Sequence, residues 1–492
     1  MEVGIKLTRR NIGVNAALNT IKTLLTIAFP IVTVPYLSRT LGKSEYGKFN
    51  YSVSIVSYFV LIAGLGFTTY AIREGAKFRG NSKQINVFAS EAFTLNVLST
   101  ALSYILLAIL LMVATQLSSY KSYIMVLSVN ILFVTLGADW INSIYEDYLY
   151  ITIRYIIVQV SALVFMFVFV KSAYDLMNYT IIYLFSQVGA NLMNMLYIRK
   201  YVHLRMYFSK NILKHVAPVM ILFVSNLAMT LYVNSDITLL GILKNNAAVG
   251  VYSVASKVYA GAKQIVVAGT VVTIPRLSAY IGEKNSLDYD RLLNNIFNML
   301  ISLTVPVFTG LFMLSNPVMK IMGGKSFSSG APTLQLLCIA SIFSIVSYFY
   351  AQCVLIPNKR EKTFLYATLL AAVVNIAFNF IMIPLLSHIG AALTTVLAEL
   401  VVMLFCRHYS KGFGMIVVDK NTILSVVTSS IVIIVICYMS LKIFSSDIMA
   451  LIVATVLSAV SFLAVMFVMK NVYILSLFSK MIQKIKNNGR RL

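Results

Sequence analysis

Long apolar runs separated by short polar connectors dominate the chain. A membrane-spanning helix needs about 20 mostly apolar residues, and fourteen runs of this kind can be placed. They are expected near residues 15–35, 50–67, 88–114, 122–139, 153–170, 179–198, 216–240, 248–274, 292–315, 332–356, 363–385, 389–406, 422–443 and 448–469. The pattern predicts an all-α polytopic membrane protein with about 14 transmembrane helices.

Short glycine motifs recur at equivalent places in the two halves of this pattern. Leu-Gly at residues 41–42 precedes Gly-Lys-Phe at 47–49, and Leu-Gly at 240–241 precedes Gly-Val-Tyr at 250–252. Repeated halves are typical of secondary transporters, so we expect two six-helix lobes. The expected divisions are 1–200 for the N-terminal lobe, 201–213 for a cytoplasmic amphipathic connector, 214–410 for the C-terminal lobe, and 411–492 for two additional helices with a basic cytoplasmic tail.

Composition also indicates a membrane protein, because 59% of the 492 residues are hydrophobic and only 11% are charged. The net charge of +24 lies in connectors between apolar runs, not on a folded basic face, which argues against nucleic-acid binding. By the positive-inside rule, these cations predict a multi-pass protein of the cell (cytoplasmic or inner) membrane with both termini in the cytoplasm. The connector at residues 139–154 fits this orientation poorly, because it is acidic where cations are expected.

The sequence indicates neither catalysis nor a cofactor. The four cysteines lie in or beside apolar runs and the four histidines are scattered, so no disulfide framework or metal site is predicted. No pair of carboxylates is spaced for general acid–base catalysis, and no glycine-rich phosphate-binding loop is present. We therefore expect a transporter without catalytic residues, metal or cofactor. A membrane-embedded polysaccharide polymerase or glycosyltransferase is the alternative from another functional class.

Three lysines lie on polar faces inside the predicted helices. Asn19 and Lys22 share a stripe of the first helix, and Lys257 and Lys263 lie in the eighth. A cation at the membrane centre costs about 3 kcal/mol on insertion scales, so these lysines are not expected to face lipid. A water-filled cavity between the lobes would present them to an anion such as a diphosphate. The alternative is pairing with an acidic residue, or extension of the side chain to the membrane interface.

Three acidic residues, Glu91, Asp236 and Glu399, fall in or near the ends of predicted helices. Each is a candidate for carrying a coupling proton or sodium ion, and each could equally be the structural partner of a lysine. Uncharged polar stripes, such as Asn50, Ser54 and Ser57, are equally explained by hydrogen bonds between packed helices.

Three groups of residues resemble the signatures of polysaccharide-repeat-unit flippases of the Wzx type, which transport O-antigen and capsule units. The N-terminal signature is matched at residues 35–42, 46–47, 64–67 and 72–74. The second-lobe signature is matched at residues 236–241, 250–253 and 275–278. A third match comprises residues 358–362, Asn375, Asn379, Pro384, 390–392 and Glu399.

The resemblance implies the fold of the multidrug/oligosaccharidyl-lipid/polysaccharide exporter superfamily, with two six-helix lobes in a V shape and two added C-terminal helices. It implies alternating-access transport of an undecaprenyl-diphosphate-linked oligosaccharide from the cytoplasmic to the outer leaflet, for capsule, O-antigen or exopolysaccharide synthesis. A cationic central cavity is implied as well, in agreement with Lys22, Lys257 and Lys263. Arg39 would lie at the outer gate, with Arg73 and Arg276 as gate residues nearer the cytoplasm.

The resemblance also implies partners and leaves alternatives open. The expected partners are the lipid-linked oligosaccharide, membrane lipids, a polysaccharide polymerase and other assembly proteins. A flippase for lipid II or a teichuronic-type cell-wall precursor remains the alternative within transport. A drug exporter is disfavoured, because cations in the cavity would repel cationic drugs.

Overall fold

The computed structural model describes residues 12–475, apart from residue 210 and residues 271–272. Helices form the regular structure of this part of the chain, which contains no strand. Twelve helices within it are long and apolar enough to cross a membrane. The prediction of an all-α polytopic protein is therefore confirmed, whereas the count of fourteen spans is not.

Two features explain the different count. The predicted helices at 15–35 and 50–67 belong to a single element, α1 (Ile12–Gly64), which kinks at Gly42. In addition, α9 (Asn246–Val267) contains Lys257 and Lys263 and is too polar to qualify as a span by composition. The polar side chains that make α9 a candidate for function are thus the ones that weaken its membrane signal.

The kink in α1 depends on backbone geometry. Gly42 has φ of 73° and ψ of 170°, a conformation that residues with a Cβ atom rarely adopt. No atom lies within 4 Å of the position that a Cβ at Gly42 would occupy, so the backbone angle alone favours glycine. The bend falls at the end of residues 35–42, the stretch on which the N-terminal resemblance rests.

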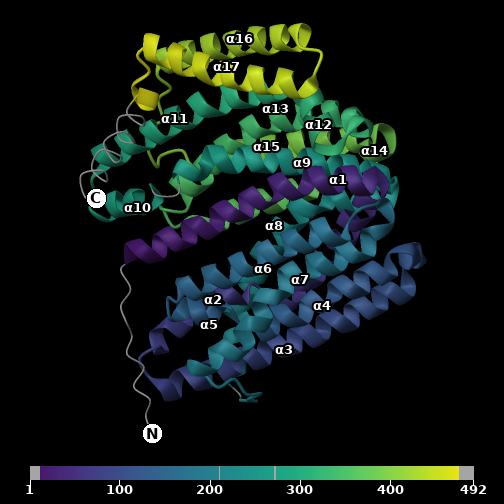
Figure 1. Cartoon of the computed structure of the whole chain (residues 1–492). Helices are drawn as coiled ribbons and strands as arrows, with labels where there is room; N and C mark the ends of the chain where they lie inside the picture. The colour runs from purple at the N-terminus through teal and green to yellow at the C-terminus, as the bar shows by residue number, and fades with distance from the viewer. Residues whose placement is uncertain (1–11, 210, 271–272, 476–492) are drawn as a thin grey trace, which may run out of the picture. The chain divides into compact units, whose positions relative to one another are not determined.

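Contacts divide the chain into two compact units, residues 1–234 and 235–492, with the division inside α8 (Ile212–Leu243). The lobe boundaries expected from the sequence stay a prediction. The helices that follow α1 are α2 (Phe67–Gly75), α3 (Ser82–Val113), α4 (Lys121–Gly137), α5 (Trp140–Ile144), α6 (Tyr148–Phe169), α7 (Leu176–Tyr197) and α8. Within the first unit, α1 packs against α3, α4, α6 and α7 (Figure 1).

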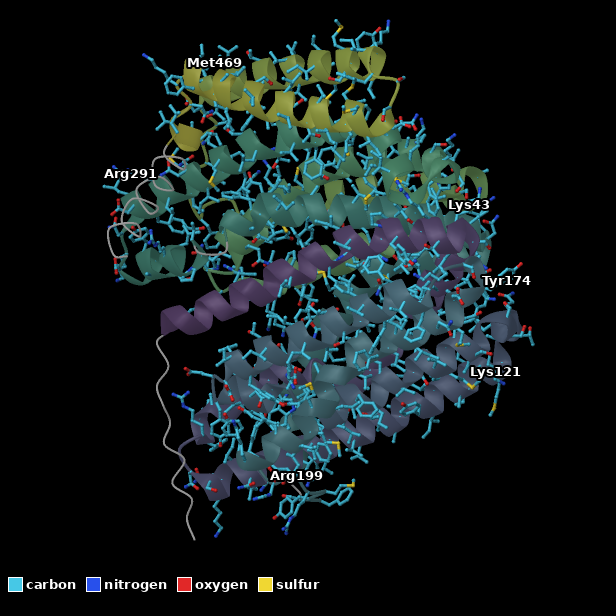
Figure 2. All side chains as sticks on the ribbon, viewed as in Figure 1. Lys43, Lys121, Tyr174, Arg199, Arg291 and Met469 are labelled. Carbon is cyan, nitrogen blue, oxygen red and sulfur yellow. The ribbon has the colours of Figure 1, made fainter. Side chains whose placement is uncertain are left out.

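Successive connectors of the first unit alternate between the two ends of its helices. Lys43, Lys121 and Tyr174 lie at one end, and Arg199 lies at the other (Figure 2). Residues 202–209, which follow Arg199, are irregular, and they run beside α3. There the backbone N–H groups of His203 and Tyr207 donate to side chains of that helix.

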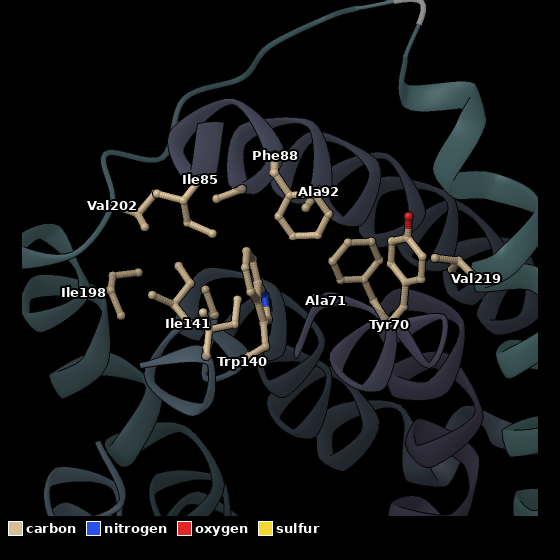
Figure 3. Close-up of a cluster of buried hydrophobic side chains, with 14 residues drawn as sticks. Tyr70, Ala71, Ile85, Phe88, Ala92, Trp140, Ile141, Ile198, Val202 and Val219 are labelled. Carbon is tan, nitrogen blue, oxygen red and sulfur yellow. The ribbon is translucent and has the colours of Figure 1, made fainter. Parts of the chain in front are cut away.

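A buried aromatic cluster fixes the short helices α2 and α5 against α3. Trp140 of α5 packs against Phe67 of α2. Tyr70 of α2 packs against Phe88 of α3 in the same cluster (Figure 3). Val219 brings the start of α8 to the same cluster. The cluster thereby sets where the polar side chains of α2, α3 and α8 lie.

The second unit is built around contacts of α13 with α15, of α14 with α15, and of α11 with α16. Its last two helices, α16 and α17, form an antiparallel pair (Figure 1) whose outward apolar side chains stay exposed, as expected of helices facing lipid. Besides α9, its helices are α10 (Ile274–Gly282), α11 (Ser286–Met313), α12 (Ser315–Gly323), α13 (Ala331–Phe349), α14 (Glu361–Leu386), α15 (His388–Tyr409), α16 (Lys420–Ile443) and α17 (Asp447–Val468).

The acidic connector at residues 139–154 is neutralised by cations from neighbouring segments. Glu146 pairs with Arg79 at 2.7 Å, and Asp147 pairs with Lys200 at 3.3 Å. Burial alone would raise the pKa of Asp147, but hydrogen bonds from Tyr197 and Tyr201 and the charge of Lys200 outweigh it and hold that pKa below its ordinary value. The acidic side chains therefore join this connector to the cationic segments around it.

Candidate functional site

The lysine predicted for the first unit lies beside an aromatic ring. Lys22 is partly buried on α1, and its Nζ atom lies 5.6 Å from the centroid of the Tyr155 ring on α6. A cation at this distance from an aromatic face is attracted by the ring quadrupole. The side chain of Asn19, one turn earlier, lies outside the described residues.

The first unit also contains a buried cation that the sequence analysis did not single out. Arg154 of α6 is only 1% exposed. Its guanidinium donates to Asp139 and, at 2.9 Å, to the carbonyl of Ala190 on α7. Asn194 of α7 donates to the same carboxylate at 3.1 Å. The signal was present in the sequence, because an arginine near the start of an apolar run must find a partner when the helix packs.

Glu91, a predicted ion-coupling residue, lies in a chain of hydrogen-bonding side chains. The Oε2 atom of Glu91 on α3 lies 3.2 Å from Nε2 of His215 on α8. The other ring nitrogen of His215, Nδ1, lies 2.6 Å from the hydroxyl of Tyr70 on α2. His215 was missed because one scattered histidine carries little information before the fold brings it to a carboxylate.

In the second unit, Lys263 and Glu399 form an ion pair. The Nζ atom of Lys263 on α9 lies 3.6 Å from Oε1 of Glu399 on α15, and the carboxylate is almost fully buried. Ser344 of α13 donates to the same oxygen at 2.6 Å, and Tyr259 donates to it at 3.2 Å. This arrangement is the pairing that the sequence left open as the alternative to a substrate-facing lysine.

Asp236 on α8 is 3% exposed and lies in a network of uncharged polar groups. Asn379 donates to its Oδ1 at 2.6 Å, Thr395 donates to its Oδ2 at 2.8 Å, and the hydroxyl of Tyr252 donates to Oδ2 as well. Asn375 extends the network by accepting hydrogen bonds from Ser235 and Asn379. The network gathers carboxylate, amide and hydroxyl oxygens from α8, α9, α14 and α15, and such oxygens suit hard cations.

One face of α9 carries several of these contacts. Tyr252, Tyr259 and Lys263 follow at intervals of seven and four residues, which places them on one side of a helix. This spacing could have identified the two tyrosines from the sequence. Lys257, the other predicted anion-binding residue of α9, is partly exposed.

The three predicted gate arginines, Arg39, Arg73 and Arg276, are exposed. Arg73 donates to Glu74 at 3.2 Å, and Lys77 also contacts that carboxylate. Exposed ion pairs of this kind contribute little to stability, with a median of about 0–1 kcal/mol.

The oxygen-rich surroundings of Asp236 do not amount to a cluster of metal-ligating side chains. Within the described part of the chain, no group of three or more His, Cys, Asp and Glu side chains is arranged to hold a metal ion. A site for a transition metal would need such a group.

Comparison with known proteins connects this arrangement to a family. A family model described as "Polysaccharide biosynthesis protein" matches residues 11–281, more than half of the chain, and a second described as "MatE" matches residues 222–381. Two curated relatives share the name "Putative O-antigen transporter". The protein from Shigella dysenteriae is 22% identical over 381 residues, which is 77% of this chain and 94% of the relative. The protein from Escherichia coli (strain K12) is 22% identical over 393 residues, which is 76% of this chain and 90% of the relative.

Solved structures show the same fold. The lipid II flippase MurJ in an inward closed conformation is 17% identical with a TM-score of 0.73, covering 94% of this chain and all of that one. An inward-facing multidrug resistance MATE family transporter is 14% identical with a TM-score of 0.57, and the match covers 82% of this chain and 99% of that transporter. With the first family model matching more than half of its sequence, the chain belongs to the polysaccharide biosynthesis protein family and is a transporter rather than an enzyme.

Proposed function

We propose that the chain is a flippase for lipid-linked oligosaccharides. Its substrate is an undecaprenyl-diphosphate-linked polysaccharide repeat unit, which moves from the cytoplasmic to the outer leaflet for capsule, O-antigen or exopolysaccharide synthesis. The observation that carries this proposal is the presence of lysines within the helices of a polysaccharide-family transporter, with Lys22 partly buried on α1 and Lys257 partly exposed on α9. Such cations are costly in lipid and suit an anionic headgroup.

The proposed mechanism is alternating access. Lys22 and Lys257 hold the diphosphate while the lipid tail stays in the bilayer, and rearrangement of the lobes releases the head outside. Lys263 is paired with Glu399 in this structure, so it joins the phosphate ligands only after that pair opens. Arg39, Arg73 and Arg276 serve the gates, and both termini lie in the cytoplasm. The polymerase that consumes the repeat unit is the expected partner in the membrane.

Among the three acidic candidates, Asp236 is the best suited to carry the coupling ion. Glu91 has His215 and Glu399 has Lys263 as partners. Across the described residues, no Lys, Arg or His side chain forms an ion pair with Asp236. Burying an unpaired carboxylate costs several kcal/mol, and a bound proton or sodium ion would remove that cost. We propose that Asp236 binds the ion whose gradient resets the transporter.

A flippase for lipid II or a teichuronic-type precursor is the second candidate. The favouring observation is the fold shared with a lipid II flippase. A diphosphate headgroup is common to both substrate classes, so the lysines do not separate them. The two substrate classes are distinguished by supplying each lipid separately to the protein in vesicles, because only the true substrate should be translocated.

Loss of surface polysaccharide tests the proposal in cells. Lys22→Ala and Lys257→Ala should each abolish surface polysaccharide while the amount of protein in the membrane holds, because each removes a phosphate ligand. Lys43→Ala is the matched control, since Lys43 is an exposed lysine on α1. Normal polysaccharide in both Lys22→Ala and Lys257→Ala cells would refute the assignment of these lysines.

A further inference from the structure

A partly open cavity of about 130 Å³ in the first unit is lined by α1, α4 and α7. We call it the amide cavity, because its polar lining comprises Asn130 of α4 and Gln187 of α7 together with Ser57 and Tyr183. The other five lining residues are valines and leucines, and no charged side chain lines it. Since one water needs roughly 10–15 Å³ of such volume, the cavity has room for several waters or a small ring.

The polar groups of the amide cavity are open to a ligand. Asn130 and Gln187 make no side-chain hydrogen bond to any described residue, and neither does the hydroxyl of Tyr183. Ser57, in contrast, is fixed in the wall, because it donates to the carbonyl of Ser54 and accepts from Asn234. Gln187 is exposed and Asn130 is half-buried. Amides without protein partners are unfavourable against lipid in a membrane-spanning region, so their convergence on one cavity indicates a polar occupant.

The chemistry of the lining selects the class of that occupant. Side-chain amides both donate and accept, which matches neighbouring hydroxyl groups of a sugar. The valines, leucines and the Tyr183 ring match the apolar C–H faces of the same ring. The absence of a charged lining residue disfavours the diphosphate, for which Lys22 is suited.

We propose that the amide cavity binds one uncharged sugar residue of the transported glycan, through hydrogen bonds from its hydroxyls to Asn130, Gln187 and Tyr183. The proposal rests on the proposed flippase function and adds a sugar-recognition site to it. The cations then recognise the lipid diphosphate common to many substrates, while the amide cavity contributes to selection among glycans. Discrimination arises because a sugar lacking the matching hydroxyl leaves the Asn130 or Gln187 amide without a partner in the bound complex.

Native mass spectrometry of the full-length protein tests this site with two probes. One probe is the lipid-linked repeat unit extracted from the source cells, and the other is undecaprenyl diphosphate without sugar. The wild type should bind the sugar-bearing lipid about tenfold or more tightly than the sugar-free lipid, as expected from two or more hydrogen bonds. The double variant Asn130→Leu/Gln187→Met nearly preserves side-chain shape. It should lose most of this preference while binding undecaprenyl diphosphate unchanged.

Matched variants separate recognition from folding. Asn191→Leu, one turn beyond Gln187 on α7 and outside the lining, should keep the preference. Leu184→Phe should reduce the preference by filling the cavity while leaving both amides in place. The melting temperature of the double variant should not fall, because its amides have no protein partner to lose. This readout distinguishes a ligand site from a structural role.

The outcomes have distinct meanings. A preference that survives in both the double variant and Leu184→Phe would overturn the sugar site, as would a wild type that binds the two lipids equally. A wild type that binds neither lipid would instead refute the proposed flippase function. If the double variant and Leu184→Phe lose the preference only because both are unfolded, the amides have a structural role, and this result would also overturn the proposal.

Discussion

At the scale of single residues, the three acidic candidates differ in the side chains that contact their carboxylates. His215 contacts Glu91, Lys263 contacts Glu399, and only uncharged donors contact Asp236 among the described residues. The sequence placed all three inside or near apolar runs but could not rank them, because the ranking depends on partners far away along the chain. Thr395, for example, lies 159 positions from Asp236.

Asp236→Asn should remove the response of the protein to its coupling ion. An ion that binds the folded wild type raises its stability by mass action, by about 2.7 kcal/mol at one hundred times the dissociation constant. The melting temperature of the wild type should therefore rise with sodium concentration or with falling pH, and that of the variant should not. Asp447→Asn, which alters a partly exposed acid on α17, is the control and should respond as the wild type does. An unchanged response in Asp236→Asn would contradict the ion assignment.

At the scale of elements, the sequence predicted the long helices well and the short ones poorly. Apolar runs of about 20 residues carry their own signal, whereas α2, α5, α10 and α12 are short and lie within connectors or at the ends of runs. The place of α2 and α5 is set by the cluster around Trp140, which joins residues distant in the sequence. Side-chain contacts of this kind leave no periodic pattern from which they could be predicted.

The acidic connector before α6 illustrates an element held by electrostatics. Asp147→Asn should lower the melting temperature near neutral pH, because it weakens the contacts to Tyr197, Tyr201 and Lys200. The pKa of Asp147 is below its ordinary value of 3.8 in the folded protein, so its stabilising contribution is present above that value. The contribution is lost as the pH falls through the lowered folded-state pKa.

Melting curves of the wild type and the Asp147→Asn variant, recorded from neutral to acidic pH, check the direction of this pH dependence. The difference between them should be largest near neutral pH and should shrink in acid. A difference that grows as the pH falls below 4 would show that the charge of Asp147 does not stabilise this connector. Asp288→Asn, at an exposed pair with Arg291, should produce a much smaller change at every pH.

At the scale of the whole molecule, composition was sufficient to predict a polytopic membrane protein, the repeated halves pointed to a transporter, and family signatures predicted its family. The residues of the candidate site could be predicted from the sequence only in part. Lys22, Lys263, Glu91, Asp236 and Glu399 were predicted from charge inside apolar runs, and Arg154 carried the same signal without being singled out. His215 as a partner of Glu91 and the amide cavity emerge only in the folded chain. Charge in a membrane helix is conspicuous in a sequence, whereas an uncharged amide resembles many residues that merely join helices.

Translocation of the lipid-linked repeat unit by the full-length protein in sealed vesicles is the decisive measurement. The fraction of the glycan reached by a membrane-impermeant glycosidase reports its movement between leaflets. We predict movement well above that of protein-free vesicles, and about a tenfold or greater loss in Lys22→Ala and Lys257→Ala, since charged hydrogen bonds to phosphate are each removed. Wild-type movement no faster than in protein-free vesicles, or undiminished movement in both lysine variants, would contradict a flippase that binds its substrate through these cations.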